Sequence, residues 1–360
     1  MIGRTLGFYF AGRFTRSVLG VFLTVFALIY TLDFVELVRR TGDVADVPAL
    51  LLAQLALFRT PAVAEQVLPF AILFGAMAAL LNLSRKLELV VARAAGVSAW
   101  QFLAPPVLVA LLFGVFAVTA YNPISTFLRE QATNVEAARI GRAKSTTEKL
   151  LWVRQRSVDG QAIIRAERSS NSGTSLGQVT IFEFDAEGRF VNRVEAANAQ
   201  LRDGYWDLTG VRLITPEQEP QSFDSYAVAT NLTPEQVRQT FSSADSVPFW
   251  ELPSLIERSE RAGLDATRYR LQFQSLLARP LLFMAMVLVA ASVSLRFFRF
   301  GGVAKMVLGG VAAGFVLYVA TKLVEDLGSA GLLSAGLAAW SPAIVGSLLG
   351  TLALLYQEDG

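Results

Sequence analysis

Six long apolar segments without a single charged residue dominate this chain of 360 residues, three on either side of a polar stretch. Each is about 16–21 residues long, close to the length at which a helix crosses a hydrocarbon core of roughly 30 Å. The polar stretch runs for about 145 residues, from Pro123 to Tyr269. The sequence therefore predicts six membrane-spanning helices with a separately folded domain between the third and the fourth. The uncharged segments are 17–32, 66–84, 101–121, 280–295, 306–321 and 336–356.

The composition supports a membrane protein and excludes several kinds of catalytic site. Charged residues make up 17% of the chain, against about 25% in a typical soluble domain. The chain has no Cys and no His, so it lacks disulfides, thiolate nucleophiles, and the commonest general base and transition-metal ligand. It also lacks the G-x-x-x-x-G-K-[ST] motif of nucleotide-binding loops. Any energy that it uses must come from a partner or from an ion gradient.

The distribution of Lys and Arg between the apolar segments predicts the orientation in the membrane. The N-terminal segment and the connections 85–100 and 296–305 are rich in Lys and Arg, whereas 33–65 and 322–335 carry more acids than bases. Basic connections remain in the cytoplasm. We therefore expect both termini inside and the polar domain outside. Acidic residues, and no small-residue cleavage site, follow the first segment, so it is expected to be an uncleaved helix.

The stretch 48–65 precedes the second apolar segment and leaves two structures open. It is apolar but contains Arg59, Pro61 and Glu65. It could be a helix on the membrane surface, or part of a longer, tilted second helix that kinks at Pro61 and Pro69. The second alternative is favoured.

The polar domain has the alternating pattern of β-strands. In 178–184, Val179 and Ile181 share one face. Asp-Gly turns at 159–160 and 203–204 lie between alternating runs, as in hairpins, and Gly210 shifts the phase of its strand in the manner of a bulge. Several short antiparallel strands indicate a sandwich, a jelly roll or an open barrel. The apolar face is expected to be a packed core, with a lipid-holding cleft as the alternative. The predicted strands are 150–156, 161–166, 178–184, 189–201 and 205–214.

Charged residues at the predicted membrane surface allow structural or functional interpretations. Asp33, Glu36 and Arg40 lie on one helix face, with Arg39 beside them. This group is either an interfacial anchor or a charged rim that meets an anionic substrate. The spacing of Lys322, Glu325 and Asp326, at i, i+3 and i+4, favours a local ion pair over a substrate contact.

The connection 84–98 contains good helix formers and charges of both signs. It is either a connector that lies on the inner leaflet or a helix offered to a cytoplasmic partner. On a helix, Glu88 and Ala92 would share a face with Leu89, which places an acid beside apolar anchors.

Four short motifs stand in a specific order along the chain. They are 34–42 (FVELVRRTG), 68–75 (LPFAILFG), 87–98 (LELVVARAAGVS) and 340–342 (WSP). Taken together, they resemble the LptF/LptG family, the permease pair of the lipopolysaccharide-exporting ABC transporter, and within it the LptG type. Residues 87–98 are similar to the family's SELVVMRAAGVS, 68–75 to its L-P-x-A-x-L-x-G pattern, 34–42 to the end of the first LptG helix, and 340–342 to the W-x-P before the last helix. The likeness covers essentially the whole chain.

This resemblance implies a six-helix permease with a periplasmic, jellyroll-like all-β domain inserted between helices 3 and 4. Residues 1–125 would hold helices 1–3 and a cytoplasmic coupling helix at 84–98, 126–268 the β domain, and 269–360 helices 4–6. The implied partners are an LptF-type permease, two LptB-type ATPase subunits, an LptC-type bridge protein and lipopolysaccharide, with no nucleic acid. The location would be the bacterial inner membrane.

The resemblance also implies roles for particular residues. This chain would be a transport permease and not an enzyme, with no cofactor of its own, because ATP and magnesium would bind to the partner ATPase. The rival interpretation is a non-transporting membrane sensor or scaffold whose outer β domain binds a ligand. The residues expected at the ATPase contact are Glu88, Leu89, Arg93 and Gly96, and those expected to contact lipopolysaccharide are Arg39, Arg40 and Glu36.

Overall fold

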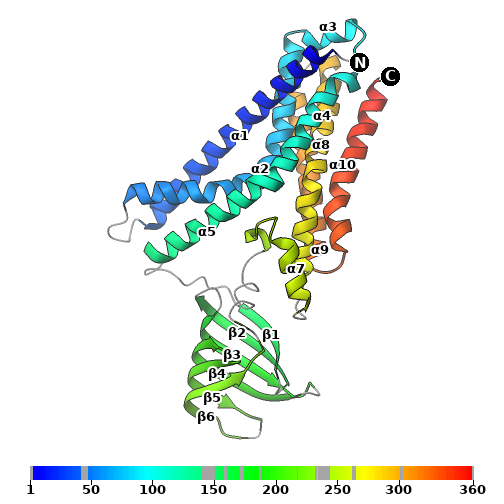
Figure 1. Ribbon diagram of the computed structural model, residues 1–360. Helices are drawn as coiled ribbons and strands as arrows, with labels where there is room; N and C mark the ends of the chain where they lie inside the picture. Colours follow the sequence, from blue (N-terminus) through cyan, green and yellow to red (C-terminus); the bar gives the residue numbers. More distant parts are fainter. Residues whose placement is uncertain are drawn as a thin grey trace. The chain divides into compact units, whose positions relative to one another are not determined.

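The computed structural model describes residues 3–41, 48–139, 151–157, 160–170, 174–185, 188–216, 218–231, 233, 244–261, 265–300 and 303–358. The chain divides into two compact units. One comprises Met1–Val135 and Ala244–Gly360, and the other Glu136–Ser243. The first is helical and the second is built from β-strands (Figure 1).

Among the described residues, six helical segments of the first unit are long and apolar enough to cross a membrane, which confirms the predicted number. Four of them are α1 (Arg4–Thr41), α2 (Ala49–Arg85), α9 (Val303–Ser329) and α10 (Ala335–Glu358). The third segment in the chain consists of α4 (Ala99–Phe116), the π-helix η1 (Ala117–Tyr121) and α5 (Asn122–Arg139), and the fourth is α8 (Thr267–Phe300). The shorter helices are α3 (Glu88–Ala94), η3 (Ala244–Ser246) and α7 (Leu252–Arg261).

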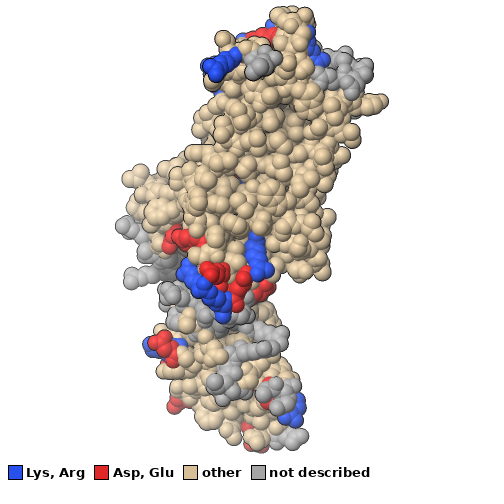
Figure 2. All heavy atoms as spheres, turned by 45° about the vertical axis from the view of Figure 1, so that its right-hand side comes forward, with Lys and Arg blue, Asp and Glu red and all other residues tan. Residues whose placement is uncertain are grey.

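Charged side chains avoid the middle of this unit. On the face shown in Figure 2, they gather at the two ends of the helical unit and leave a broad uncharged band between. Such a band is what a hydrocarbon layer requires, because a charge at its centre is costly.

Residues 49–85 form one helix, which confirms the favoured alternative of a long second helix. Pro61 and Pro69 lie inside it. A proline removes one backbone donor from a helix, and in a membrane the freed carbonyls need other partners. The carbonyls that lose their donor are those of Leu57 and Glu65, four residues before each proline. The hydroxyl of Tyr121 donates a hydrogen bond of 3.0 Å to the Pro61 carbonyl itself, which joins the third spanning segment to α2 beside this proline.

Small residues bring the helices close together. A Cβ atom on Gly75 of α2 would lie 2.6 Å from the backbone of Val18, and one on Gly114 would lie 2.3 Å from the backbone of Pro280. On α9, Gly310 and Gly314 face side chains of α2 in the same way, so this small-residue face serves helix packing. The resulting apolar core joins α1, α2, α4 and α8.

In the part of the second unit that the structure describes, six strands form one antiparallel sheet in which every strand pairs with its neighbours in sequence. It follows the third spanning segment and precedes the fourth, as predicted. The five predicted strands are confirmed, and a sixth, β6, follows them. The strands are β1 (Leu151–Ser157), β2 (Gly160–Ser170), β3 (Ser175–Phe184), β4 (Phe190–Arg202), β5 (Tyr205–Ile214) and β6 (Gln221–Ala229).

One face of the sheet forms its own core around the fully buried Trp206. The side chain of Gln155, on β1, joins the two ends of the sheet. It accepts hydrogen bonds from the Trp206 indole at 3.3 Å and from the Thr230 hydroxyl at 2.6 Å, and it donates one to the Ala229 carbonyl at 3.1 Å. The sheet is therefore strongly curved.

The predicted bulge at Gly210 is wrong. Gly210 does have a positive φ of 64°, and the buried face changes phase there, from Leu208 to Val211. The pairing of β5 with β4 nevertheless keeps the same register on both sides of this glycine. On the paired strand β4 the buried positions shift in the same way, from Ala196 to Ala199, which lie opposite Val211 and Leu208. Both strands therefore present their other side to the core beyond this point, and no residue is inserted.

Candidate functional site

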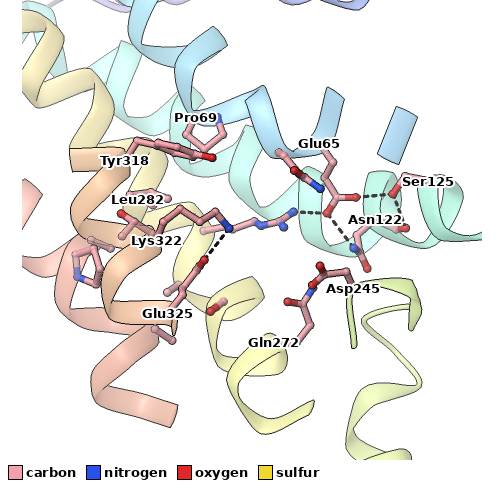
Figure 3. Close-up of a pocket in the computed structure, with 18 of the residues that line it drawn as sticks. Glu65, Pro69, Asn122, Ser125, Asp245, Gln272, Leu282, Tyr318, Lys322 and Glu325 are labelled. Carbon is pink, nitrogen blue, oxygen red and sulfur yellow. Dashed lines mark hydrogen bonds and ion pairs between the residues drawn. The ribbon is translucent and has the colours of Figure 1, made fainter. Parts of the chain in front are cut away.

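A cavity of about 210 Å³ opens among the helices of the first unit, lined by residues of α2, α5, η3, α8, α9 and α10 (Figure 3). Both charged and apolar side chains surround it. The charged ones are Glu65, Arg129, Asp245, Arg279, Lys322 and Glu325, and the apolar ones include Pro69, Leu282, Met286 and Ala343.

Glu65 is the centre of the polar side of this cavity. It is 6% exposed, and all its partners come from other helices. The Asn122 amide donates to its carboxylate at 2.9 Å, the Ser125 hydroxyl donates to the other carboxylate oxygen, and Arg279 forms an ion pair with it. A carboxylate among apolar helices is stable only when it is paired and hydrogen-bonded in this way.

The π-helix η1 leads the chain into Asn122 and fixes the segment that returns from the β domain. Asn122 accepts a hydrogen bond of 2.9 Å from the backbone N–H of Phe249. The indole of Trp250 donates to the carbonyl of Thr119, inside the π-helix, at 3.1 Å. π-Helical turns leave backbone groups without their usual helical partners and often occur at functional sites. Asn122 thus links the returning segment with Glu65.

On the α9 side of the cavity, Lys322 and Glu325 form an ion pair of 2.8 Å, which confirms the predicted local pair. Arg129 lines the cavity from α5 and has no ion-pair partner among the described residues. The Ser275 hydroxyl is buried and likewise has no described hydrogen-bond partner. Leu282 and Met286 follow Arg279 by about one and two helical turns, so the charged side of the cavity continues into an apolar part. This arrangement suits an amphiphile.

The predicted rim residues on α1 lie outside the lining of this cavity. Arg39 and Arg40 both pair with Glu36, each at 2.7 Å, and their side chains are 77% and 61% exposed. The group thus keeps one net positive charge at the surface. Nearby, Asp33 faces Arg59 of α2 at 3.7 Å, so this acid is offset by a base from the next helix.

The predicted coupling segment contains α3, a short helix between two sharp turns. Leu87 precedes it with a φ of +60°. At its end the N–H of Gly96, with a φ of +82°, bonds to the Arg93 carbonyl at 2.9 Å, and the N–H of Val97 bonds to the Ala92 carbonyl at 3.1 Å. These two bonds make a Schellman motif, in which glycine takes the left-handed position.

The four predicted coupling residues have different surroundings. Leu89 is 3% exposed and packs in a buried cluster with Phe10 and Phe102. The guanidinium of Arg93 lies 5.9 Å from the centre of the Phe102 ring. The carboxylate of Glu88 contacts α1 through Tyr9 and Arg13.

The outward face of this segment was not singled out from the sequence. Leu87, Val90 and Val91 are 59%, 43% and 67% exposed. Their spacing of i, i+3 and i+4 is the signal that could have identified them, because it places three apolar side chains on one face.

In the part of the chain that the structure describes, six membrane-type helices around a partly charged cavity, with a β domain inserted in sequence, define a polytopic membrane protein. The chain belongs to the LptF/LptG family, since residues 8–357 match the family described as "Lipopolysaccharide export system permease LptF/LptG".

Individual members of the family also match this chain along most of its length. The lipopolysaccharide export system permease protein LptG of Escherichia coli (strain K12) is 26% identical over 364 residues, which cover 97% of this chain and 92% of that protein. The protein of the same name from Haemophilus influenzae is 23% identical over 339 residues, 89% of each chain. The family resemblance of the four sequence motifs is thereby confirmed.

Proposed function

We propose that this chain is the LptG-type permease of an inner-membrane ABC transporter that extracts lipopolysaccharide and passes it to a periplasmic bridge. The observation that carries this proposal is the family match along residues 8–357. In this arrangement an LptF-type permease is the second membrane subunit, two LptB-type subunits hydrolyse ATP, and an LptC-type protein receives the lipid. The β domain lies in the periplasm, as the basic connections on the other side favour.

The lipid-handling part of the proposal rests on two groups of cations. Arg39 and Arg40, balanced in part by Glu36, stand exposed at one end of α1 and suit the phosphates of an entering lipid. Within the helices, Arg129 and the cavity's apolar continuation suit a phosphate group joined to an acyl chain.

The coupling part of the proposal rests on α3. Its exposed apolar face, Leu87, Val90 and Val91, docks into a groove of the ATPase. Leu89 and Gly96 give the segment its shape, Arg93 stands over Phe102, and Glu88 secures it to α1. Force from ATP hydrolysis then enters the membrane helices through this segment.

The test is reconstitution. The chain is co-expressed with the second permease and the ATPase of the same organism, purified by a tag on this chain, and placed in proteoliposomes that contain lipopolysaccharide. We expect a stable complex that transfers lipopolysaccharide to the purified bridge protein only when ATP is hydrolysed. A chain that purifies without an ATPase, or a complex whose ATP hydrolysis moves no lipid, would instead favour a sensor or scaffold.

A further inference from the structure

Three side chains connect the beginning of α1 with α3. The hydroxyl of Tyr9 donates a hydrogen bond of 2.7 Å to one carboxylate oxygen of Glu88. The same hydroxyl accepts hydrogen bonds from two guanidinium nitrogens of Arg13, at 3.0 and 2.9 Å. Arg13 also faces the other carboxylate oxygen of Glu88 at 3.7 Å. The carboxylate is therefore engaged on both oxygens by a single helix.

The surroundings strengthen this connection. The side chains of Arg13 and Glu88 are each 28% exposed, so water screens their pairing only in part. Phe10, the residue next to Tyr9, is buried in the same apolar cluster as Leu89. The guanidinium of Arg13 lies 5.2 Å from the centre of the Tyr9 ring, which fixes the orientation of both side chains. α1 and α3 are thus joined by an apolar contact and by a charged hydrogen-bond network.

α1 is well suited to carry a displacement. It is one helix of 38 residues without an internal proline, about 57 Å long at 1.5 Å per residue. Only 6% of its most apolar stretch is buried within the chain, although Phe14 and Val18 near its beginning pack in the core with α2. Its other end carries the exposed Arg39 and Arg40.

We infer that Tyr9 and Arg13 are positioning residues that act through Glu88: they hold α3 to α1, so that a movement of α3 driven by the ATPase reaches the far end of α1. This inference rests on the proposed function. It assigns Glu88 to a contact within the chain, and it leaves the direct ATPase contact to the apolar face of α3.

The decisive variant is Tyr9→Phe, which removes one hydroxyl and keeps the ring. Tyr30→Phe is the matched control, because Tyr30 lies on the same helix and its hydroxyl bonds to no described residue. In the reconstituted complex we expect Tyr9→Phe to leave complex recovery and basal ATP hydrolysis unchanged and to lower the lipid released per ATP about ten-fold, since a hydrogen bond to a charged group is lost. Equal amounts of lipid released per ATP in Tyr9→Phe and Tyr30→Phe would overturn the inference.

A double-mutant cycle separates action through Glu88 from independent effects. If Tyr9 works through the carboxylate, Tyr9→Phe combined with Glu88→Ala, which removes the acceptor of the Tyr9 hydrogen bond, should lose no more lipid release per ATP than the worse single variant. If the loss in the double variant equalled the product of the two single losses, the two side chains would act separately, which would contradict the inference.

A distance measurement tests, without reference to lipid export, whether a movement of α3 reaches the far end of α1. Spin labels at Leu32→Cys on α1 and Leu337→Cys on α10 are feasible because the chain has no Cys and both positions are exposed. We expect the distance between the labels to change when a non-hydrolysable ATP analogue is added to the complex, and Tyr9→Phe to abolish that change. The inference would be overturned if the distance did not change in the labelled complex that keeps Tyr9, or if it changed equally in that complex and in its Tyr9→Phe variant. A change without lipid release would contradict the proposed function alone.

Discussion

Glu65 on α2 and Arg279 on α8 form an ion pair although 214 residues, including the whole β domain, separate them in sequence. The two side chains are 7% and 21% exposed. Their pairing joins the helices that precede the β domain to those that follow it. The inserted domain can therefore lie between the two halves of the sequence without dividing the helical unit.

Arg279→Gln should destabilise the helical unit because it leaves the Glu65 carboxylate buried without a cation. Removing one partner of a buried pair costs about 3–5 kcal/mol. Adding Glu65→Gln should restore much of the lost stability, since the uncompensated charge disappears. Thermal unfolding in detergent measures both effects. Arg270→Gln is the control: Arg270 pairs with Glu260 at the surface, where such pairs contribute about 0–1 kcal/mol. Equal losses in the two Arg variants would show that Glu65 does not need its partner.

The orientation of the chain can be tested by cysteine labelling, because the natural sequence has no Cys. Ser225 in β6 and Ala95 after α3 are both exposed. An impermeant thiol reagent added to spheroplasts should modify Ser225→Cys and should modify Ala95→Cys only after the membrane is opened. Labelling of Ala95→Cys in intact spheroplasts would reverse the topology and remove α3 from the cytoplasm. Ser172, another position suited to this test from the sequence, lies outside the described residues.

Arg39→Glu combined with Arg40→Glu should lower the stimulation of ATP hydrolysis by lipopolysaccharide, by about ten-fold or more if both cations contact phosphate. The change turns a group of one acid and two bases into three acids. Because both Arg side chains are exposed and pair only with Glu36 among the described residues, complex recovery should be unchanged. The same charge change at Arg189 and Arg212 of the β domain is the control. Unchanged stimulation in the α1 variant would leave this group as an interfacial anchor.

Much of the fold follows from short-range patterns that a sequence displays directly. Uncharged segments identified the six helices because their length must match the membrane. Alternation identified β2–β5 because each has one buried face, and the Asp-Gly turn at 159–160 identified β1 before it. The sixth strand, Gln221–Ala229, was missed because its first five residues are all exposed, so half of it has no apolar face.

The cavity could not be predicted in the same way. Glu65 reads as an interruption of an apolar helix, and its partner Arg279 follows 214 residues later, so only the packing of α2 on α8 reveals the pair. On α3 the sequence offered two apolar faces. Which of them is buried depends on α1 and α4, where Phe10 and Phe102 cover Leu89. The side that remains free was therefore not identified.

Glu88→Lys should abolish lipid export, while Glu88→Gln should have a milder effect. A lysine there would place its ammonium beside the Arg13 guanidinium, so the attraction at 3.7 Å becomes repulsion. A glutamine keeps an oxygen that can accept the Tyr9 hydrogen bond. Complex recovery, ATP hydrolysis and lipid release are measured for each variant beside the unaltered chain.

Val91→Glu is the matched variant on the other face of α3, since Val91 is 67% exposed and belongs to the proposed ATPase contact. We expect Val91→Glu to lower recovery of the ATPase in the complex, because a charge is buried in an apolar contact. Glu88→Lys should instead retain the ATPase and lose lipid release per ATP, because its contact lies within the chain. If Glu88→Lys loses the ATPase while Val91→Glu keeps it, the carboxylate itself is the docking group and the two faces of α3 must exchange roles.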